Sequence, residues 1–165
     1  MQKIIILLTA ILCTQIACNE QFTADEIIQK CITQHGGEKY NTLQTKFNFR
    51  ENTYTVQHQN GLFTYSKILN DSTIDVLTND GFTRFVNQQK FTMDSIKAFQ
   101  AKEALNSVIY FSLLPYGLNG PAVYRKLLGE YAVGQKKYYV IQITFDANGG
   151  GTDYEDLFYY WIEKE

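Results

Sequence analysis

Two periodicities divide the chain, and the first is helical. Between residues 23 and 35, apolar side chains recur at the spacing of one helix face. The stripe consists of Ile27, Ile28, Cys31, Ile32 and His35. Thr23 and Glu26 stand at the positions of a capping box, and Gly36–Gly37 end the pattern. The pattern predicts an N-terminal helix whose apolar face must be covered by another element.

The second periodicity is the alternation of apolar and polar residues that is typical of β-strands. Short turns rich in Asn, Asp and Gly interrupt it. The expected strands are residues 45–57, 62–69, 72–77, 82–86, 127–133, 137–145 and 154–162. Within the first, Phe47 and Phe49 have one parity and Tyr54 and Val56 the other, which allows a bulge near Glu51–Asn52. Strands joined by such short turns predict an antiparallel meander.

Residues 94–105 return to a helical pattern, and residues 107–114 form one of the most apolar runs outside the N-terminus. Asn106 can cap a second helix there, although a strand is the alternative because short apolar runs are ambiguous. A helix that is apolar all round is either a core helix beneath the sheet or a movable plug across the hollow of a curved sheet. The second interpretation places a hinge at Pro115, Gly117 and Gly120.

The last strand pattern is apolar on both faces, because Leu157–Ile162 contains no polar position at the strand period. A strand of this kind is normally covered on both sides. Either another element covers it, or the domain is incomplete at its C-terminus and further strands follow.

The first residues have the pattern of an export signal. Lys3 precedes the apolar run 4–13, which is too short to span a bilayer. Ile16–Ala17–Cys18 resembles a lipobox, where the signal is cut before a cysteine that then carries acyl chains such as palmitate. The alternative is an ordinary secretory signal cut near Ala17, which would release a soluble protein.

The predicted organisation is therefore a signal peptide at 1–17, a lipidated Cys18 with a short tether at 18–22, and a single domain at 23–165. Four tether residues reach at most about 14 Å, so the domain would stay close to its membrane. The expected location is a bacterial cell envelope, membrane-anchored and facing the periplasm or the cell surface.

Composition narrows the choice of partner. The 165 residues suffice for one domain, and they include 15 basic and 17 acidic side chains. Loss of Lys3 with the signal leaves 14 basic residues and a net charge of −3. No basic stripe is present, which argues against nucleic acid. With Cys13 removed and Cys18 lipidated, Cys31 has no disulfide partner and is expected to be a buried thiol.

Candidate chemistry is sparse. His35 and His58 do not stand in a ligand-like spacing, and nucleophile-elbow, P-loop and dinucleotide motifs are missing from the sequence. The segment Asp146–Asp156 alternates oxygen-bearing residues, but Leu157 stands where a calcium loop needs a bidentate glutamate. We therefore predict no catalytic residue, metal site or cofactor.

Several motifs together carry a resemblance to known proteins. They are His35–Gly37, Asn79–Phe82, Asn106–Phe111, Leu113–Asn119 and Tyr160–Ile162. On these, most of the chain after the signal resembles a family of uncharacterised envelope lipoproteins. Its topology is similar to the half-barrel envelope proteins that include the lipoprotein carrier LolA and its lipidated receptor LolB. The resemblance implies an α+β half-barrel, in which a curved antiparallel sheet wraps around an N-terminal helix and one or two helices in or across its concave face.

These expectations converge on a non-enzymatic, membrane-anchored domain that binds an apolar ligand, such as a lipid acyl chain or a lipoprotein. The residues expected to line its cavity are Phe47, Phe49, Phe111, Leu114 and Trp161. A structural or interaction module with a filled core is the alternative, with its protein partner left open. An enzyme is the third hypothesis.

Overall fold

The computed structural model describes residues 22–147, 151 and 154–164. Its elements, in chain order, are α1 (Ala24–His35), η1 (Gly37–Thr42), β1 (Gln44–Phe49), β2 (Asn52–Gln59), β3 (Leu62–Asn70), β4 (Thr73–Thr78), β5 (Gly81–Val86), β6 (Gln89–Phe91), α2 (Ser95–Ser112), η2 (Tyr116–Asn119), β7 (Val123–Val133), β8 (Lys136–Phe145) and β9 (Phe158–Glu163). The expected mixture of helices and antiparallel strands is confirmed.

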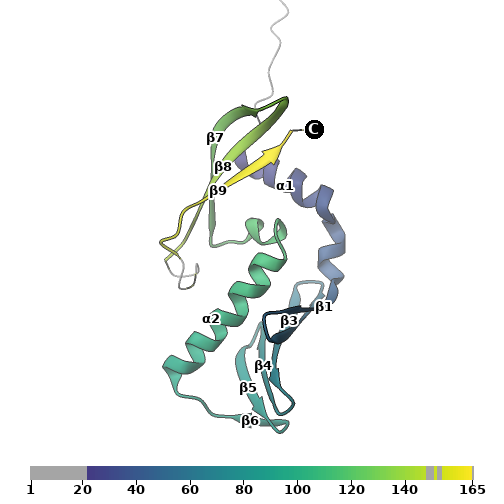
Figure 1. Ribbon diagram of the computed structural model, residues 1–165, viewed down its shortest axis with the longest axis vertical. Helices are drawn as coiled ribbons and strands as arrows, with labels where there is room; N and C mark the ends of the chain where they lie inside the picture. Colours follow the sequence, from purple (N-terminus) through teal and green to yellow (C-terminus); the bar gives the residue numbers. More distant parts are fainter. Residues whose placement is uncertain (1–21, 148–150, 152–153, 165) are drawn as a thin grey trace, which may run out of the picture.

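Within the described residues, the strands form two antiparallel sheets, one in the order β1-β2-β3-β4-β5-β6 and the other β7-β8-β9. The sequence predicted one curved sheet. The sheets lie toward opposite ends of the long axis, with η2 between them and α2 running from there alongside the β1–β6 sheet (Figure 1). The chain leaves the first sheet through α2, an 18-residue helix, instead of a short hairpin, so β7 does not pair with β6.

Helix α1 forms as its sequence predicts. The Thr23 side chain accepts a hydrogen bond from the Glu26 amide, and the Glu26 carboxylate accepts one from the Thr23 amide. Ile27, Ile28 and Ile32 are buried against the β7–β9 sheet. Cys31, expected to be a buried thiol, is half-buried, and burial raises the pKa of its thiol.

The β1–β6 sheet is an antiparallel meander as predicted, with the short β6 added and residues 45–57 divided into two strands. β1 and β2 pair as a hairpin in which Phe49 faces Asn52 across a two-residue turn. Arg50 in that turn has φ 54°, a left-handed conformation that is uncommon for Arg. The change of parity along the sequence therefore marks a turn, and the bulge expected near Glu51–Asn52 does not form.

Helix α2 is continuous from Ser95 to Ser112, where the sequence suggested two helical pieces. Asp94 caps its N-terminus, and Asn106, expected to be a cap, lies exposed in mid-helix. The C-terminal half of α2 covers the inner face of the β1–β6 sheet. The buried cluster at this contact contains Tyr54, Val56, Leu77, Leu105, Ile109 and Leu113.

Strand β9 is covered on one face only. Phe158, Tyr160 and Ile162 pack toward α1 and the core of the β7–β9 sheet, while Tyr159 and Trp161 are exposed. Of the two alternatives that the sequence left open, a second covering element is not found among the described residues. The outer face of this sheet is an aromatic surface in contact with solvent.

Candidate apolar binding site

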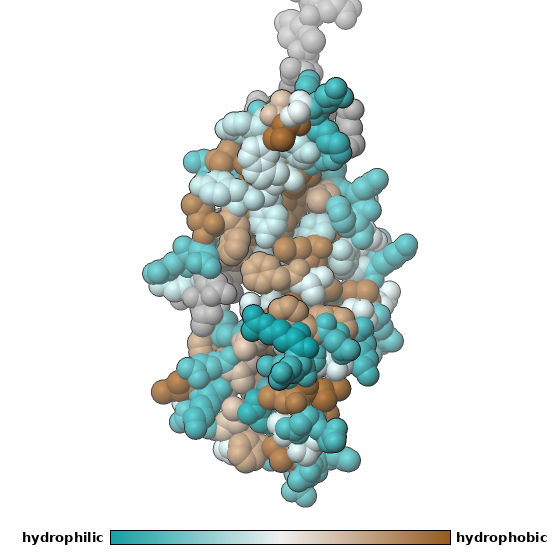
Figure 2. Space-filling view, in the orientation of Figure 1, coloured by the Kyte–Doolittle hydropathy of each residue, from teal (hydrophilic) through white to brown (hydrophobic). Residues whose placement is uncertain are grey.

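A hollow of about 530 Å³ opens where the two sheets meet, and we call it the seam hollow. Its walls come from the C-terminal half of α2, the segment after η2, the start of β3 and the adjacent ends of β8 and β9. The volume falls within the range of about 300–1,000 Å³ that is usual for small-molecule sites. Figure 2 shows apolar residues gathered in the middle of the visible face, at the level where the two halves of the molecule meet.

Four aromatic rings form one wall of the seam hollow. Phe145 and Phe158 have ring centroids 5.9 Å apart, and Phe158 lies at the same distance from Phe111. Tyr110 completes the wall through edge contacts with Phe111 at 5.3 Å and with Phe145 at 5.9 Å. The rings come from α2, β8 and β9, so this wall exists only when the β7–β9 sheet docks on α2.

Another part of the seam hollow is lined by residues with little or no side chain, including Gly117, Gly120, Pro121 and Ala122. Gly117 lies directly against the ring of Tyr110. A Cβ atom at Gly117 would come within 2.7 Å of Tyr110 Cε2. The glycine therefore permits the close approach of η2 to α2.

Tyr110 has a second unusual feature. Its hydroxyl oxygen is buried and has no hydrogen-bond partner within the described part of the chain. Burial, together with the nearby Tyr160 hydroxyl, raises its pKa far above the ordinary value, so the group stays neutral. The ring faces the seam hollow, and the side chain therefore acts there as an apolar wall.

A second hollow of about 470 Å³, the side groove, lies along an adjacent face of the same helix. Phe47 and Phe49 of β1 form one side of it, and Val108 and Phe111 of α2 form another. Ser107 and Phe111, one turn apart on α2, contact both the side groove and the seam hollow. An apolar chain that crossed this ridge would contact both hollows.

The structure brings together part of the predicted cavity set. Phe111 lines both hollows, and Phe47 and Phe49 line the side groove. Leu114 packs instead against the core cluster beneath η2, where it is partly buried. Trp161 is 51% exposed and points to the outer face of the β7–β9 sheet, because strand parity separates it from Phe158 and Tyr160. These two positions correct the prediction.

The predicted hinge residues surround η2. Pro115 directly precedes η2, while Gly117 and Gly120 line the seam hollow. Sequence reasoning missed Tyr110, Phe145 and Phe158 as lining residues. The strand patterns could have identified Phe145 and Phe158. Each lies at the end of a strand, at a position whose side chain points to the buried face of the sheet. Cys18, the predicted lipid attachment site, lies outside the described residues.

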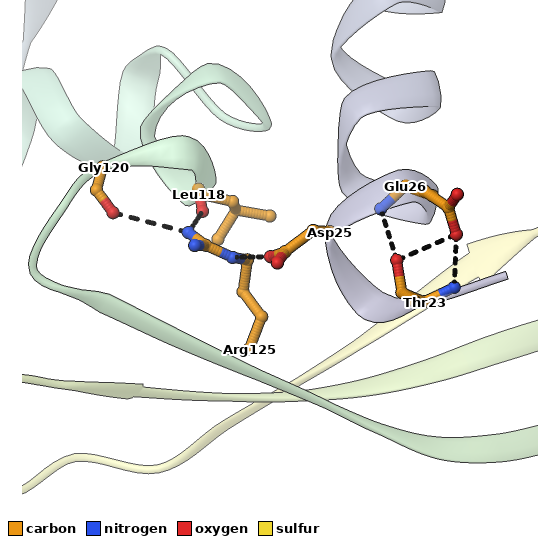
Figure 3. A network of polar contacts seen from close by, with 6 residues as sticks. All are labelled: Thr23, Asp25, Glu26, Leu118, Gly120 and Arg125. Carbon is orange, nitrogen blue, oxygen red and sulfur yellow. Dashed lines mark hydrogen bonds and ion pairs between the residues drawn. The ribbon is translucent and has the colours of Figure 1, made fainter.

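An arginine holds the segment after η2 in place (Figure 3). Arg125 of β7 donates through Nη1 to the carbonyl oxygen of Leu118 at 2.8 Å and toward that of Gly120 at 3.4 Å. Its Nε donates to the carboxylate of Asp25 in the first turn of α1. The Arg125 guanidinium thus ties α1, η2 and β7 together beside the seam hollow.

A buried histidine ties η2 to the other sheet. His58 of β2 is 2.7 Å from the Tyr40 carbonyl oxygen through Nδ1 and 2.8 Å from the Tyr65 hydroxyl through Nε2. The carbonyl can only accept, so Nδ1 is the donor in that bond. Tyr116 of η2 stacks on Tyr40 at 4.7 Å.

Tyr65 also lines the seam hollow, and burial raises the pKa of its hydroxyl to about 12.

Ionisable groups are few around the seam hollow. Glu103 of α2 lines it, with its side chain 11% exposed and paired to Lys102 at 3.2 Å. In the described part of the chain, His, Cys, Asp and Glu side chains do not gather in a group of three or more that could hold a metal ion. The loop at Asp146–Asp156 lies partly outside that region. Apolar contact is the chemistry that the seam hollow offers.

The fold and this site define a mixed α+β protein of two antiparallel sheets with an apolar hollow at their junction. The chain belongs to the DUF6503 family, a family of unknown function, which it matches over residues 2–165. The expectation of an uncharacterised family is thereby confirmed. Comparisons with curated proteins and with solved structures gave no match. The family supplies no ligand or reaction, so a functional argument must start from the site.

Proposed function

We propose that this protein is an envelope lipoprotein that binds an apolar chain, such as a lipid acyl group, in the seam hollow. One observation carries the proposal: the seam hollow is walled by aromatic rings and by glycine, proline and alanine positions that leave room for a ligand. Each methylene moved from water into such a site contributes about 0.8 kcal/mol. A structural module would be expected to fill this space with its own side chains.

The half-barrel resemblance enters the proposal in modified form. In this account the two sheets are the separated parts of one curved surface, and α2 lies beside the β1–β6 sheet with its C-terminal end toward the other sheet (Figure 1). The side groove extends the apolar surface beyond Phe111 toward β1. A long, flexible chain suits this arrangement better than a compact ligand, because it can lie across the ridge formed by Ser107 and Phe111.

The anchor in this proposal is Cys18, carrying acyl chains in a membrane of the cell envelope and facing the periplasm or the cell surface. Two or more acyl chains anchor a protein stably. None of the helices among the described residues has the length and hydropathy needed to cross a bilayer. The short tether, about 14 Å at most, favours a resident acceptor over a diffusing carrier.

Binding in the seam hollow is tested with a fluorescent fatty acid and variants of α2. Phe111→Ala removes a wall of both hollows and should weaken binding about tenfold, equivalent to about 1.4 kcal/mol. Phe99→Ala is the matched control, because Phe99 lies on the same helix, is exposed to a similar extent and lines neither hollow. Equal effects of the two changes, or no binding by the unaltered protein, would contradict the proposal.

A blocking variant gives a second test. Ser107→Phe places a large side chain on the ridge between the hollows and should abolish binding, while Gln100→Phe, two helical turns earlier and exposed, should not. The anchor is tested separately, by mass spectrometry of protein extracted from membranes. An acylated Cys18 is expected, with release of the protein from membranes in Cys18→Ala.

A further inference from the structure

The outer face of the β7–β9 sheet is an exposed aromatic surface that the seam hollow does not use. Trp161, the single tryptophan of the chain, is 51% exposed, and its ring lies 5.7 Å from Tyr131 and 6.2 Å from Tyr138. Val133, at the end of β7, is 57% exposed. We call Tyr131, Val133, Tyr138 and Trp161 the aromatic face.

The strand register explains why these residues gather on one side. Tyr131 pairs with Tyr138, and Val140, next on that face of β8, pairs with Trp161. Val140 itself is buried beneath its neighbours. Residues of the opposite parity, such as Tyr139, face α1 instead. The strand register therefore places these side chains next to one another as one continuous surface.

The aromatic face lies at the end of the molecule where the described chain begins. The Phe22 ring packs edge-on against Tyr139 at 6.4 Å, on the inner side of the strand that carries Tyr138. Phe22 is the fourth residue after Cys18, a span of at most about 14 Å. A lipid on Cys18 would consequently hold this end of the sheet against the membrane.

The composition of this end suits a bilayer interface. Tyrosine and tryptophan favour the headgroup level, where the ring is partly dehydrated and the polar atom stays hydrated. The charged side chains at this end are paired: Lys136 bonds to Glu163 at 2.8 Å, and Lys164, which lies over the Tyr139 ring on the inner side of the sheet, bonds to Glu130 at 2.6 Å. The exposed rings are therefore the feature that suits this end to an interface.

We propose that the aromatic face rests in the headgroup layer of the membrane to which Cys18 is attached. This inference rests on the proposed anchor but not on the proposed ligand. Phe145 stands nine residues along β8 from Lys136, about 30 Å at the usual rise per residue, so the aromatic face and the seam hollow are separate surfaces.

The test uses Trp161 as its own probe. The chain from Cys18 to Glu165, which keeps every described element, carries Cys31→Ser so that Cys18 is its single thiol. Cys18 is coupled to a maleimide lipid in phosphatidylcholine vesicles that contain brominated acyl chains. This chemical tether makes the result independent of lipidation in the cell, so failure of the anchor proposal and failure of this one are distinguishable.

We expect at least about a twofold loss of Trp161 fluorescence and a blue shift, because the indole enters the interface. The control variant moves the probe to β6 with Trp161→Phe and Phe91→Trp, an exposed position in the other sheet, and should show little quenching. Tyr131→Ser with Val133→Ser should reduce the quenching of Trp161. Unquenched Trp161 or equal quenching of both probes would overturn the proposal. So would a blue shift that, on vesicles without brominated lipid, grows with the surface density of the protein, because contact between protein copies would then explain it.

Discussion

The two halves of the molecule each cover one face of an antiparallel sheet with one helix. In the half built on β1–β6, the C-terminal part of α2 covers the inner face, and the cluster between them includes Leu105 and Ile109 with almost no exposure. In the half built on β7–β9, α1 covers one face with Ile28 against Ile141, and the other face stays aromatic and exposed. Figure 1 shows the two arrangements at opposite ends of the chain's long axis.

The space between the two halves is where we propose that a ligand binds. Each half has its own buried cluster, but neither cluster fills the space between the halves. Leu113 belongs to one cluster and Leu118 to the other, so η2 and the turn before it join the two. The seam hollow is the remaining gap beside this joint. A ligand that binds there contacts both halves at once and should bring them together.

The largest expected effect lies in the β1–β6 half. Asp75 is 1% exposed and pairs with Arg84 through two hydrogen bonds of 2.6 and 2.7 Å across β4 and β5. Arg84→Met leaves a buried carboxylate without its partner and should lower the free energy of unfolding by about 3–5 kcal/mol. Urea titration followed by circular dichroism measures the change. Lys90→Met, at an exposed position of β6, is the control and should shift the midpoint little.

The joint between the halves should respond next. Gly117→Ala forces a methyl group against the Tyr110 ring and should cost about 1–3 kcal/mol of folding free energy. In a Tyr110→Leu background the same change should cost less than half as much, because the ring is gone. Thermal or urea unfolding of the four proteins of this double-mutant cycle gives the coupling. Equal costs in both backgrounds would show that η2 does not pack as described.

Helix α1 offers a smaller effect in the β7–β9 half. Thr23→Ala removes the side chain that accepts from the Glu26 amide at 3.2 Å and should destabilise the protein by about 1 kcal/mol. Thr33→Ala, on the same helix, removes only a bond from its hydroxyl to the Gln29 carbonyl oxygen. A smaller effect at Thr33 than at Thr23 in urea titrations would support the capping role, and the reverse order would contradict it.

The smallest expected effect is a pH dependence. Hydrogen bonds from the Thr23 amide and hydroxyl lower the pKa of Glu26 below its ordinary value of 4.5. The ionised Glu26 therefore stabilises the folded state fully above about pH 4.5, and this contribution is lost as the pH falls through the lowered pKa. Glu26→Gln should flatten stability between pH 3 and pH 5, measured as urea midpoints at half-unit steps of pH. If the dependence of the urea midpoint on pH is the same in Glu26→Gln, Glu26 does not cause it.

Local signals made much of this fold predictable. The capping residues and isoleucine spacing identify α1, and turns such as Asn60–Gly61 identify hairpins of the meander. The sequence failed where local rules were broken. Arg50 adopts a positive φ that its residue type does not announce, and Asn106 continues a helix that it was expected to start.

The site was harder to predict because it depends on docking between distant segments. Phe111 could be identified from the apolar run that contains it. Phe145 and Phe158 join Phe111 only because β8 and β9 return to α2, a contact that no local periodicity encodes. Trp161 was assigned to the wrong face because Leu157–Ile162 is apolar at both parities, and only the packing of α1 decides which parity is buried.

The most direct test of the central claim uses a fatty acid that carries a nitroxide near its methyl end, added to isotope-labelled protein. Paramagnetic broadening in NMR spectra then reports which residues lie near the bound chain. We predict loss of the signals of Phe111, Phe145 and Phe158, which line the seam hollow, while those of Phe91 and Trp161 persist. Broadening confined to Trp161 and its aromatic neighbours, or none at all, would contradict the assignment of the seam hollow as a binding site.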